Sequence, residues 1–182
     1  SSVPELLEMV ATTSIPAGKP LLHSASRTQQ DESIIQRVVT DTLEILKTAR
    51  IPLSGKESVE ISAHYGLDIF GEVGALIIDK VNREYCKKII VVFPGQTHPV
   101  HHHIKKEEAF ELLHGDCVLT LNSKAIKMKK GDPILINRGV KHGFESESGC
   151  VIEEISTTHV PGDSVYEDAR INTLPLTERK VK

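Results

Sequence analysis

The chain contains no tryptophan, only 4% aromatic residues, and three cysteines among its 182 residues. The cysteines at 86, 117 and 150 are odd in number and lack CxxC spacing. They therefore indicate neither a disulfide framework nor a structural zinc knuckle. This cysteine usage fits a reducing compartment, and we expect a cytoplasmic protein.

Long apolar runs and clustered basic charge are also missing. The longest apolar runs, such as residues 89–93, are far shorter than the roughly 20 residues that a membrane-spanning helix needs. The formal net charge is -3, and the lysine pairs at 87–88, 105–106 and 129–130 are scattered. Nucleic acids and membrane surfaces require a clustered excess of Lys and Arg, so we expect neither as a partner.

Residues 31–50 have the period of an amphipathic helix. Apolar side chains recur there at i, i+3 and i+4 spacings, namely Ile34, Ile35, Val38, Val39, Leu43 and Leu46. We expect Asp31 or Ser33 to cap the start of this helix and Ile51-Pro52 to end it. Residues 4–10 predict a shorter helix upstream.

From about residue 57 the sequence changes to short segments rich in β-branched residues, with turn signals between them. These segments are 58–63, 75–81, 88–93, 117–122, 124–129, 133–137 and 149–156. Many short strands at regular spacing predict a sandwich or a barrel. We expect a mainly β protein with an N-terminal helical extension at 1–56, a single β-barrel at 57–170 and a C-terminal tail at 171–182, which wraps the surface.

The segment 98-HPVHHHIKKEE-108 holds four of the nine histidines in the chain. Side chains at i and i+2 of a strand share one face. His101 and His103 can therefore point together into a barrel while His102 points away. Two imidazoles on one face of a strand supply half of a metal site.

The accompanying carboxylate is Glu107 or Glu108. Phe110 and Leu112 share the parity of Glu108. Since apolar side chains should face the core, Glu108 is the inward residue. A third imidazole is available from His142, which follows the turn at Gly139 and begins the next strand.

The spacing of these residues resembles the paired motifs of the cupin superfamily. Segment 95–115 reads Gly, five residues, HxH, four residues, Glu, six residues, Gly. Segment 131–142 reads Gly, five residues, Asn137 where proline is usual, one residue, Gly, two residues, His. The resemblance implies a cupin jelly-roll barrel whose metal ligands are His101, His103, Glu108 and His142.

Three imidazoles and one carboxylate suit one divalent transition metal, Mn, Zn, Ni, Co or Fe, better than Ca or Cu(I). Most of these ions prefer five or six ligands. Four protein ligands therefore leave positions open for water or for two oxygens of a substrate.

A narrower resemblance is to cupins grouped with D-lyxose ketol-isomerase, including the cupin extensions of N-acetylneuraminate synthases. It is carried by 64-HYGLDIF-70, 82-NREYCKK-88, 95-GQTHPVHHHIKKEE-108 and 154-EISTTHVPGDSVYED-168. It implies an aldose–ketose shift in which Glu154 shuttles the carbon-bound proton and Lys106 stabilises charge on oxygen. The residue pattern leaves both roles open, because Lys106 could be a solvated turn lysine and strand alternation does not decide between Glu153 and Glu154.

Three functions are compatible with the sequence. The first is a divalent-metal-dependent sugar isomerase of D-lyxose isomerase type, and the second is a non-catalytic module that binds a sugar or amino sugar and is linked to a sialic acid synthase. The third is an Fe(II) oxygenase, which ranks last because only the ligand set supports it. We expect a homodimer, since jelly-roll cupins often exchange edge strands.

Overall fold

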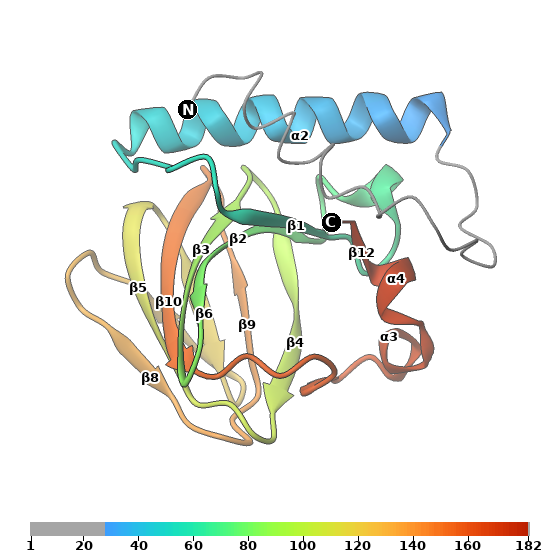
Figure 1. Ribbon diagram of the computed structural model, residues 1–182. Helices are drawn as coiled ribbons and strands as arrows, with labels where there is room; N and C mark the ends of the chain where they lie inside the picture. The colour runs from blue at the N-terminus through green and yellow to red at the C-terminus, as the bar shows by residue number, and fades with distance from the viewer. Residues whose placement is uncertain (1–27, 182) are drawn as a thin grey trace.

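The computed structural model describes residues 28–181 and consists mainly of two antiparallel β-sheets (Figure 1). The shorter helix predicted at 4–10 lies outside the described residues. The seven-stranded sheet has the order β12-β1-β2-β3-β10-β5-β8, and the five-stranded sheet has the order β11-β4-β9-β6-β7. The expected cupin jelly roll is confirmed.

The strands of the seven-stranded sheet are β12 (Lys180–Val181), β1 (Ser58–Ser62), β2 (Ala75–Asn82), β3 (Tyr85–Val92), β10 (Cys150–Thr157), β5 (Glu108–Gly115) and β8 (Ile134–Ile136). Those of the five-stranded sheet are β11 (Ser164–Tyr166), β4 (Thr97–His103), β9 (His142–Glu145), β6 (Val118–Leu121) and β7 (Lys124–Lys127). The helices are α2 (Gln29–Thr48), the 3-10 helix η1 (Leu67–Ile69), α3 (Ala169–Thr173) and α4 (Leu176–Arg179).

Helix α2 lies across the outer face of the seven-stranded sheet (Figure 1). Its fully buried Val39 and Leu46 belong to one core cluster with Ile78 and Val91 of the sheet. The strands β2 and β3 are thus covered on both faces, by α2 outside and by the barrel core inside. This double burial accounts for the continuous apolar run at 89–93, where an open sheet would show alternation.

The cap of α2 differs from the prediction. The side chain of Thr28 accepts a hydrogen bond from the backbone N–H of Asp31, and the Asp31 carboxylate accepts one from the N–H of Thr28. Asp31 is therefore the third helical residue of a capping box, and neither it nor Ser33 is the cap. No helix of residues 28–181 is long and apolar enough to cross a membrane.

A second core cluster fills the space between the two sheets. It joins Ile90, Phe110 and Ile152 of the seven-stranded sheet to Leu119 and Phe144 of the five-stranded sheet. This cluster borders the polar residues described below, because Ile90, Phe110 and Phe144 line the same small cavity as those residues.

The C-terminal segment contributes one strand to each sheet. Strand β11 pairs with β4, and β12 pairs with β1 at the edge of the seven-stranded sheet. The sequence predicted only a tail on the surface, because strands of three and two residues are too short to show a period. Helices α3 and α4 of this segment lie on the side of the barrel where β4 runs (Figure 1).

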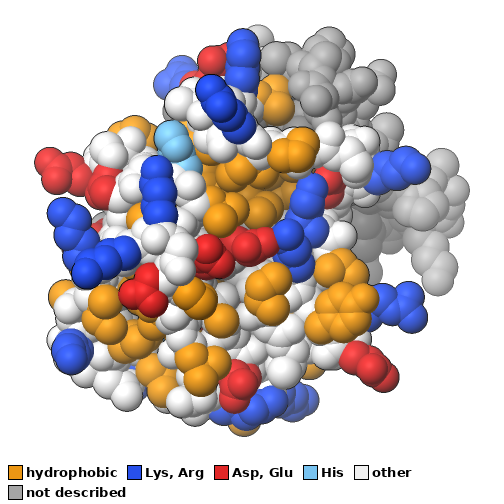
Figure 2. All heavy atoms as spheres, turned by 90° about the vertical axis from the view of Figure 1, so that its left-hand side faces the viewer, with side chains coloured by type: hydrophobic (Ala, Val, Ile, Leu, Met, Phe, Trp, Pro, Cys, Tyr) orange, Lys and Arg blue, Asp and Glu red, His pale blue; other side chains and the backbone are white. Residues whose placement is uncertain are grey.

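One face of the molecule, beside β5 and β8, shows hydrophobic side chains lying among charged ones (Figure 2). Large apolar side chains are exposed on two strands of the seven-stranded sheet, Leu135 on β8 at 55% and Ile155 on β10 at 48%.

Candidate metal centre and active site

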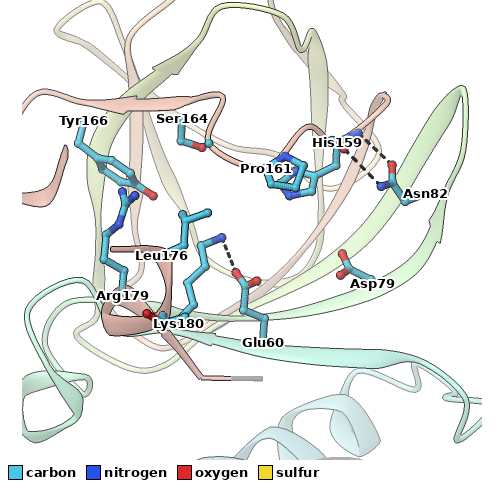
Figure 3. Close-up of a pocket in the computed structure, with 12 residues that line it drawn as sticks. Glu60, Asp79, Asn82, His159, Pro161, Ser164, Tyr166, Leu176, Arg179 and Lys180 are labelled. Atoms are coloured by element: carbon cyan, nitrogen blue, oxygen red, sulfur yellow. Dashed lines mark hydrogen bonds and ion pairs between the residues drawn. The ribbon is translucent and has the colours of Figure 1, made fainter. Parts of the chain in front are cut away.

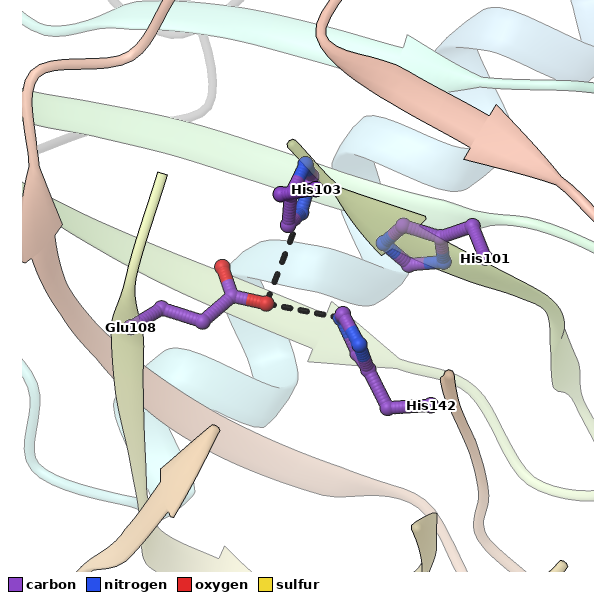
Figure 4. A group of neighbouring side chains, drawn as sticks. All are labelled: His101, His103, Glu108 and His142. Atoms are coloured by element: carbon purple, nitrogen blue, oxygen red, sulfur yellow. Dashed lines mark ion pairs between the residues drawn. The ribbon is translucent and has the colours of Figure 1, made fainter. Parts of the chain in front are cut away.

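Four buried side chains from three strands meet inside the barrel (Figure 4). They are His101 and His103 of β4, Glu108 at the start of β5 and His142 at the start of β9. One nitrogen or oxygen atom of each lies within 4.8 Å of the others. Strand pairing contributes directly, because His101 and His142 are register partners of β4 and β9.

The structure places Glu108 inside the barrel, as strand parity predicts, with 2% of its surface exposed. Glu107 is partly exposed and pairs with Arg138 at 3.3 Å. The change of parity between His103 and Glu108 occurs in the turn of residues 104–107, which separates β4 from β5.

A carboxylate that the sequence did not single out holds this turn. Buried Asp163 accepts hydrogen bonds from the backbone N–H groups of Ile104 at 3.2 Å, Lys105 at 2.9 Å and Lys106 at 3.0 Å. Its carboxylate also lies 3.8 Å from Nδ1 of His103. Asp163 falls within the segment 154–168 that carries the isomerase resemblance, but no spacing rule connects it to residues 104–106.

Backbone carbonyls orient two of the imidazoles. Nδ1 of His101 lies 3.0 Å from the Pro99 carbonyl, and Nδ1 of His142 lies 3.0 Å from the Val140 carbonyl. A carbonyl can only accept, so in each ring Nδ1 carries the proton and Nε2 presents a lone pair. Second contacts of this kind commonly fix the orientation of metal-binding histidines.

The donor set fits a cation. Nε2 of His142 lies 2.7 Å from Oε1 of Glu108, yet neither atom has a hydrogen-bond partner among the described residues. In the neutral tautomer of His142, two lone pairs face each other in a buried site, which is unfavourable unless positive charge lies between them. Both oxygens of Glu108 lack a hydrogen bond within residues 28–181, although a lysine lies nearby.

Protonation states also fit metal ligation. Burial, reinforced by the neighbouring imidazoles, holds the pKa of His101 well below its ordinary value. Burial alone would raise the pKa of Glu108, but contacts with His103 and His142 and the charge of Lys106 outweigh it and hold this pKa well below the usual range. Neutral imidazoles and an ionised carboxylate are the forms that bind metals.

Lys106 and Glu154 lie beside this cluster, each with 4% of its surface exposed. Nζ of Lys106 is 2.6 Å from Oε1 of Glu154 and 2.6 Å from Oε2 of Glu108. The alternative of a solvated turn lysine is therefore wrong. Glu154 is the inward residue of its pair, because Glu153 instead pairs with Lys87 at 2.6 Å and is only partly buried.

The charge of Lys106 is firmly held. Burial would lower the pKa of its ammonium, but the carboxylates of Glu154 and Glu108 outweigh burial and raise the pKa above its ordinary value. A cavity of about 50 Å³ is lined by Lys106, Glu108 and Glu154 together with His101 and His103. Residues that the sequence predicted as metal ligands and residues that it predicted as catalytic thus line the same cavity.

Tyr166 and His64 lie near the metal cluster. The sequence analysis did not predict that they would be neighbours of it. The ring of Tyr166 lies 5.3 Å from that of His101, between ring centres, and its hydroxyl is 2.8 Å from Nε2 of His64. Both residues fall in segments that carry the isomerase resemblance, which is the signal that could have found them.

Comparisons with known proteins agree with this geometry. Residues 88–152 match the family model described as Cupin domain. Together with the two-sheet jelly roll, the match supports a cupin barrel in the part of the chain from β3 to β10. The chain also resembles D-lyxose isomerases.

Two curated relatives carry this second resemblance. The D-lyxose/D-mannose isomerase of Thermosediminibacter oceani is 26% identical, covering 81% of this chain and 98% of the relative. The D-lyxose ketol-isomerase of Thermofilum sp. (strain ex4484_79) is 23% identical, covering 79% of this chain and 97% of the relative.

Solved structures show the same fold. The L-ribose isomerase of Acinetobacter sp. DL28 in complex with L-ribose superposes with a TM-score of 0.65 at 18% identity, covering 81% of this chain and 95% of that chain. The L-ribose isomerase of Cellulomonas parahominis with L-psicose gives a TM-score of 0.63 at 14% identity, covering 78% and 94%.

Proposed function

We propose that the protein is a divalent-metal-dependent aldose–ketose isomerase that acts on a small sugar. The observation that carries this proposal is the buried contact of Lys106 with both Glu154 and Glu108 at 2.6 Å. A site that only binds sugar has no need of a proton carrier beside its metal ligands. The names of the curated relatives, D-lyxose/D-mannose isomerase and D-lyxose ketol-isomerase, support the reaction class.

In this proposal His101, His103, Glu108 and His142 hold one divalent ion, Mn, Zn, Ni, Co or Fe. When bound, such an ion would supply Lewis-acid polarisation of the sugar oxygens, which would acidify the proton on the hydroxyl-bearing carbon next to the carbonyl group. The three imidazoles are neutral ligands and Glu108 supplies one negative charge, so the centre keeps net positive charge for substrate oxygens.

Glu154 is the proposed base. Its carboxylate removes the proton from C2 of the aldose and delivers a proton to C1, while the hydroxyl proton of O2 is transferred to O1, so that the reaction needs no redox partner. Lys106 donates hydrogen bonds, and its ammonium stabilises negative charge that develops on the substrate oxygen. The ammonium also offsets the repulsion between the two buried carboxylates.

The test is a turnover assay with the metal-loaded protein. Pentoses, hexoses and their terminal phosphates are incubated with Mn, Co, Ni, Zn or Fe, and ketose formation is followed together with solvent deuterium entering the product. We expect metal-dependent conversion that is lost in His101→Ala. Saturable sugar binding without product would point instead to a binding module, and absence of turnover across the panel would overturn the isomerase proposal.

A homodimer and a cytoplasmic location are also proposals. Exposed Leu135 and Ile155 on the seven-stranded sheet offer apolar area for a second copy. Light scattering that gives the mass of a monomer would contradict the dimer. The three cysteines are free and buried, which fits a reducing compartment.

A further inference from the structure

A larger cavity of about 530 Å³ adjoins the metal centre (Figure 3). It lies between β1–β2, the loop after β10 and the C-terminal segment. It shares four lining residues with the small cavity of the metal centre, namely His159, Ser164, Tyr166 and Lys180. Its volume is in the range of small-molecule binding sites, about 300–1,000 Å³. The larger cavity therefore forms the approach to the metal centre.

One cation of this cavity has no carboxylate partner. Lys180 pairs with Glu60 at 2.7 Å, and Lys88, which lines the small cavity, lies 3.5 Å from Asp79. Arg179 is only 8% exposed, yet within residues 28–181 no ion pair joins its guanidinium to a carboxylate and its Nε has no hydrogen-bond partner. Buried arginines are rare without a partner, because desolvating the charge costs free energy.

The lining of the larger cavity also carries two carboxylates, and each of them faces a lysine: Glu60 pairs with Lys180, and Asp79 lies 3.5 Å from Lys88. Burial lowers the pKa of His159 to about 4, and the charges of Lys88, Lys106 and Lys180 act in the same direction. His159 is therefore neutral near pH 7. The lysines of the two cavities are paired with carboxylates. An incoming anion would therefore bind to the guanidinium of Arg179.

Arg179 lines the larger cavity but not the small cavity of the metal centre, whereas His101 and His103 line only the small one. Its guanidinium carbon lies 5.7 Å from the centre of the Tyr166 ring, and that ring lies 5.3 Å from the ring of His101. The Tyr166 ring thus contacts both the guanidinium of Arg179 (Figure 3) and the ring of a metal-cluster histidine. The Arg179 carbonyl accepts a hydrogen bond from the N–H of Ala63 at 2.8 Å, which ties the residue to the sheet.

We propose that Arg179 binds an anionic group, a carboxylate or a phosphate, at the end of the substrate remote from the metal. The substrate would then be a sugar acid or a sugar phosphate. A planar guanidinium matches both groups with two parallel hydrogen bonds. This inference rests on the proposed isomerase function for the sugar, but the anion site can be tested without turnover.

The experiment measures binding to the metal-loaded protein by titration calorimetry. The probes are ribitol, ribitol 5-phosphate, ribonate and inorganic phosphate, none of which is an aldose. We expect ribitol 5-phosphate or ribonate to bind about 10- to 100-fold more tightly than ribitol, the range for a charge-assisted hydrogen bond. Whichever anion is preferred identifies the group as phosphate or carboxylate.

Variants assign the preference to Arg179. Arg179→Met should lower the affinity for the preferred anion to that for ribitol, and Arg179→Lys should keep part of the preference. The matched control is Arg170→Met, because Arg170 is an exposed arginine of the same C-terminal segment that pairs with Asp168. Melting temperatures of all three variants show whether each is folded.

The outcomes separate the two proposals. Equal affinity of wild type for ribitol and both anions, or a preference that survives in folded Arg179→Met, would overturn the anion site even if the protein is an isomerase. If inorganic phosphate binds only when Arg179 is present and no polyol binds, the result would support the anion site. The same result would count against the sugar reaction. If Arg179→Met does not fold, a preference that is unchanged in Arg179→Lys overturns the proposal.

Discussion

The ammonium nitrogen of Lys106 lies 2.6 Å from Oε1 of Glu154 in the interior of the barrel. The same nitrogen contacts Oε2 of Glu108, also at 2.6 Å. One cation is thus shared by two buried carboxylates, of which one belongs to the metal cluster and the other is the proposed base. In the proposed mechanism, Lys106 is the single side chain that links the proton-transferring carboxylate to the metal centre.

Removal of this cation should destabilise the fold. In Lys106→Met the two carboxylates remain buried without a counter-charge, and we expect the free energy of unfolding to fall by about 3–5 kcal/mol. Urea denaturation in the presence of a chelator measures the loss, and added Mn²⁺ should restore part of it. The control Lys105→Met removes an exposed neighbouring lysine and should change little. Equal stability of the two variants would contradict the shared-cation interpretation.

Glu154→Gln should separate catalysis from metal binding. The amide keeps the size of the side chain but cannot take up a proton, so we expect kcat to fall by about 10²- to 10⁴-fold. Metal content, measured by mass spectrometry, should stay at the wild-type level. Glu153→Gln is the matched control, since Glu153 pairs with Lys87 away from the site. A Glu154 variant with wild-type kcat would remove this residue from the mechanism.

Adjacent histidines offer a test of the ligand set. His101 is buried in the cluster, whereas His102 lies on the opposite face of β4 and is partly exposed. We expect His101→Ala to reduce bound metal from about one ion per chain to a small fraction, because loss of one ligand weakens a four-ligand site strongly. His102→Ala should retain the metal. Identical metal content in the two variants would reject the proposed site.

Asp163 should act on the metal through the turn that it holds. In Asp163→Asn one acceptor oxygen and the negative charge are lost, and both serve the N–H groups of residues 104–106. We expect metal affinity to fall about 10- to 100-fold, as for other residues that orient metal ligands. Competition with a fluorescent chelator measures this change. The exposed Asp132→Asn is the control, and an unchanged affinity in Asp163→Asn would limit its role to the turn.

His64 should make stability depend on pH. Burial, followed by the charges of Lys180 and Arg179, lowers its pKa to about 4 in the folded protein, whereas an unfolded histidine titrates near 6.5. The folded state therefore binds fewer protons, and the stability present above pH 6.5 is lost as the pH falls toward 4.

Between about pH 7 and pH 4, the free energy of unfolding should fall by about 3 kcal/mol less in His64→Gln than in wild type. Denaturation curves at several pH values measure the difference, with partly exposed His102→Gln as the comparison. If His64→Gln and wild type lose stability in parallel, protonation of His64 does not limit folding.

Local patterns were sufficient to predict much of the fold and the cluster. The period of α2 and the parity of Glu108 relative to Phe110 depend on neighbouring residues, and both hold in the structure. The gathering of His142 with His101 was expected because both lie within motifs of fixed spacing. Motif spacing works here because a jelly roll fixes which strands are neighbours.

Other features depend on contacts that no local pattern records. Strand parity could not choose between Glu153 and Glu154, because both parities of β10 include apolar residues, among them the exposed Ile155. The burial of Lys106 follows from the position of Asp163, which is 57 residues away along the chain. The strands β11 and β12 are recognised only by their partners, since they are too short for a period.

The last eighteen described residues combine two tasks that are usually distributed over a barrel. They add a strand to each sheet, and they carry both Tyr166 and Arg179 into the approach to the metal. The proposed anion site thus lies after residue 163, whereas the proposed metal ligands and catalytic residues lie between residues 101 and 154. This division of labour makes the C-terminal segment a natural unit for recombination: its exchange among related barrels would retune selectivity while the reaction itself is inherited unchanged.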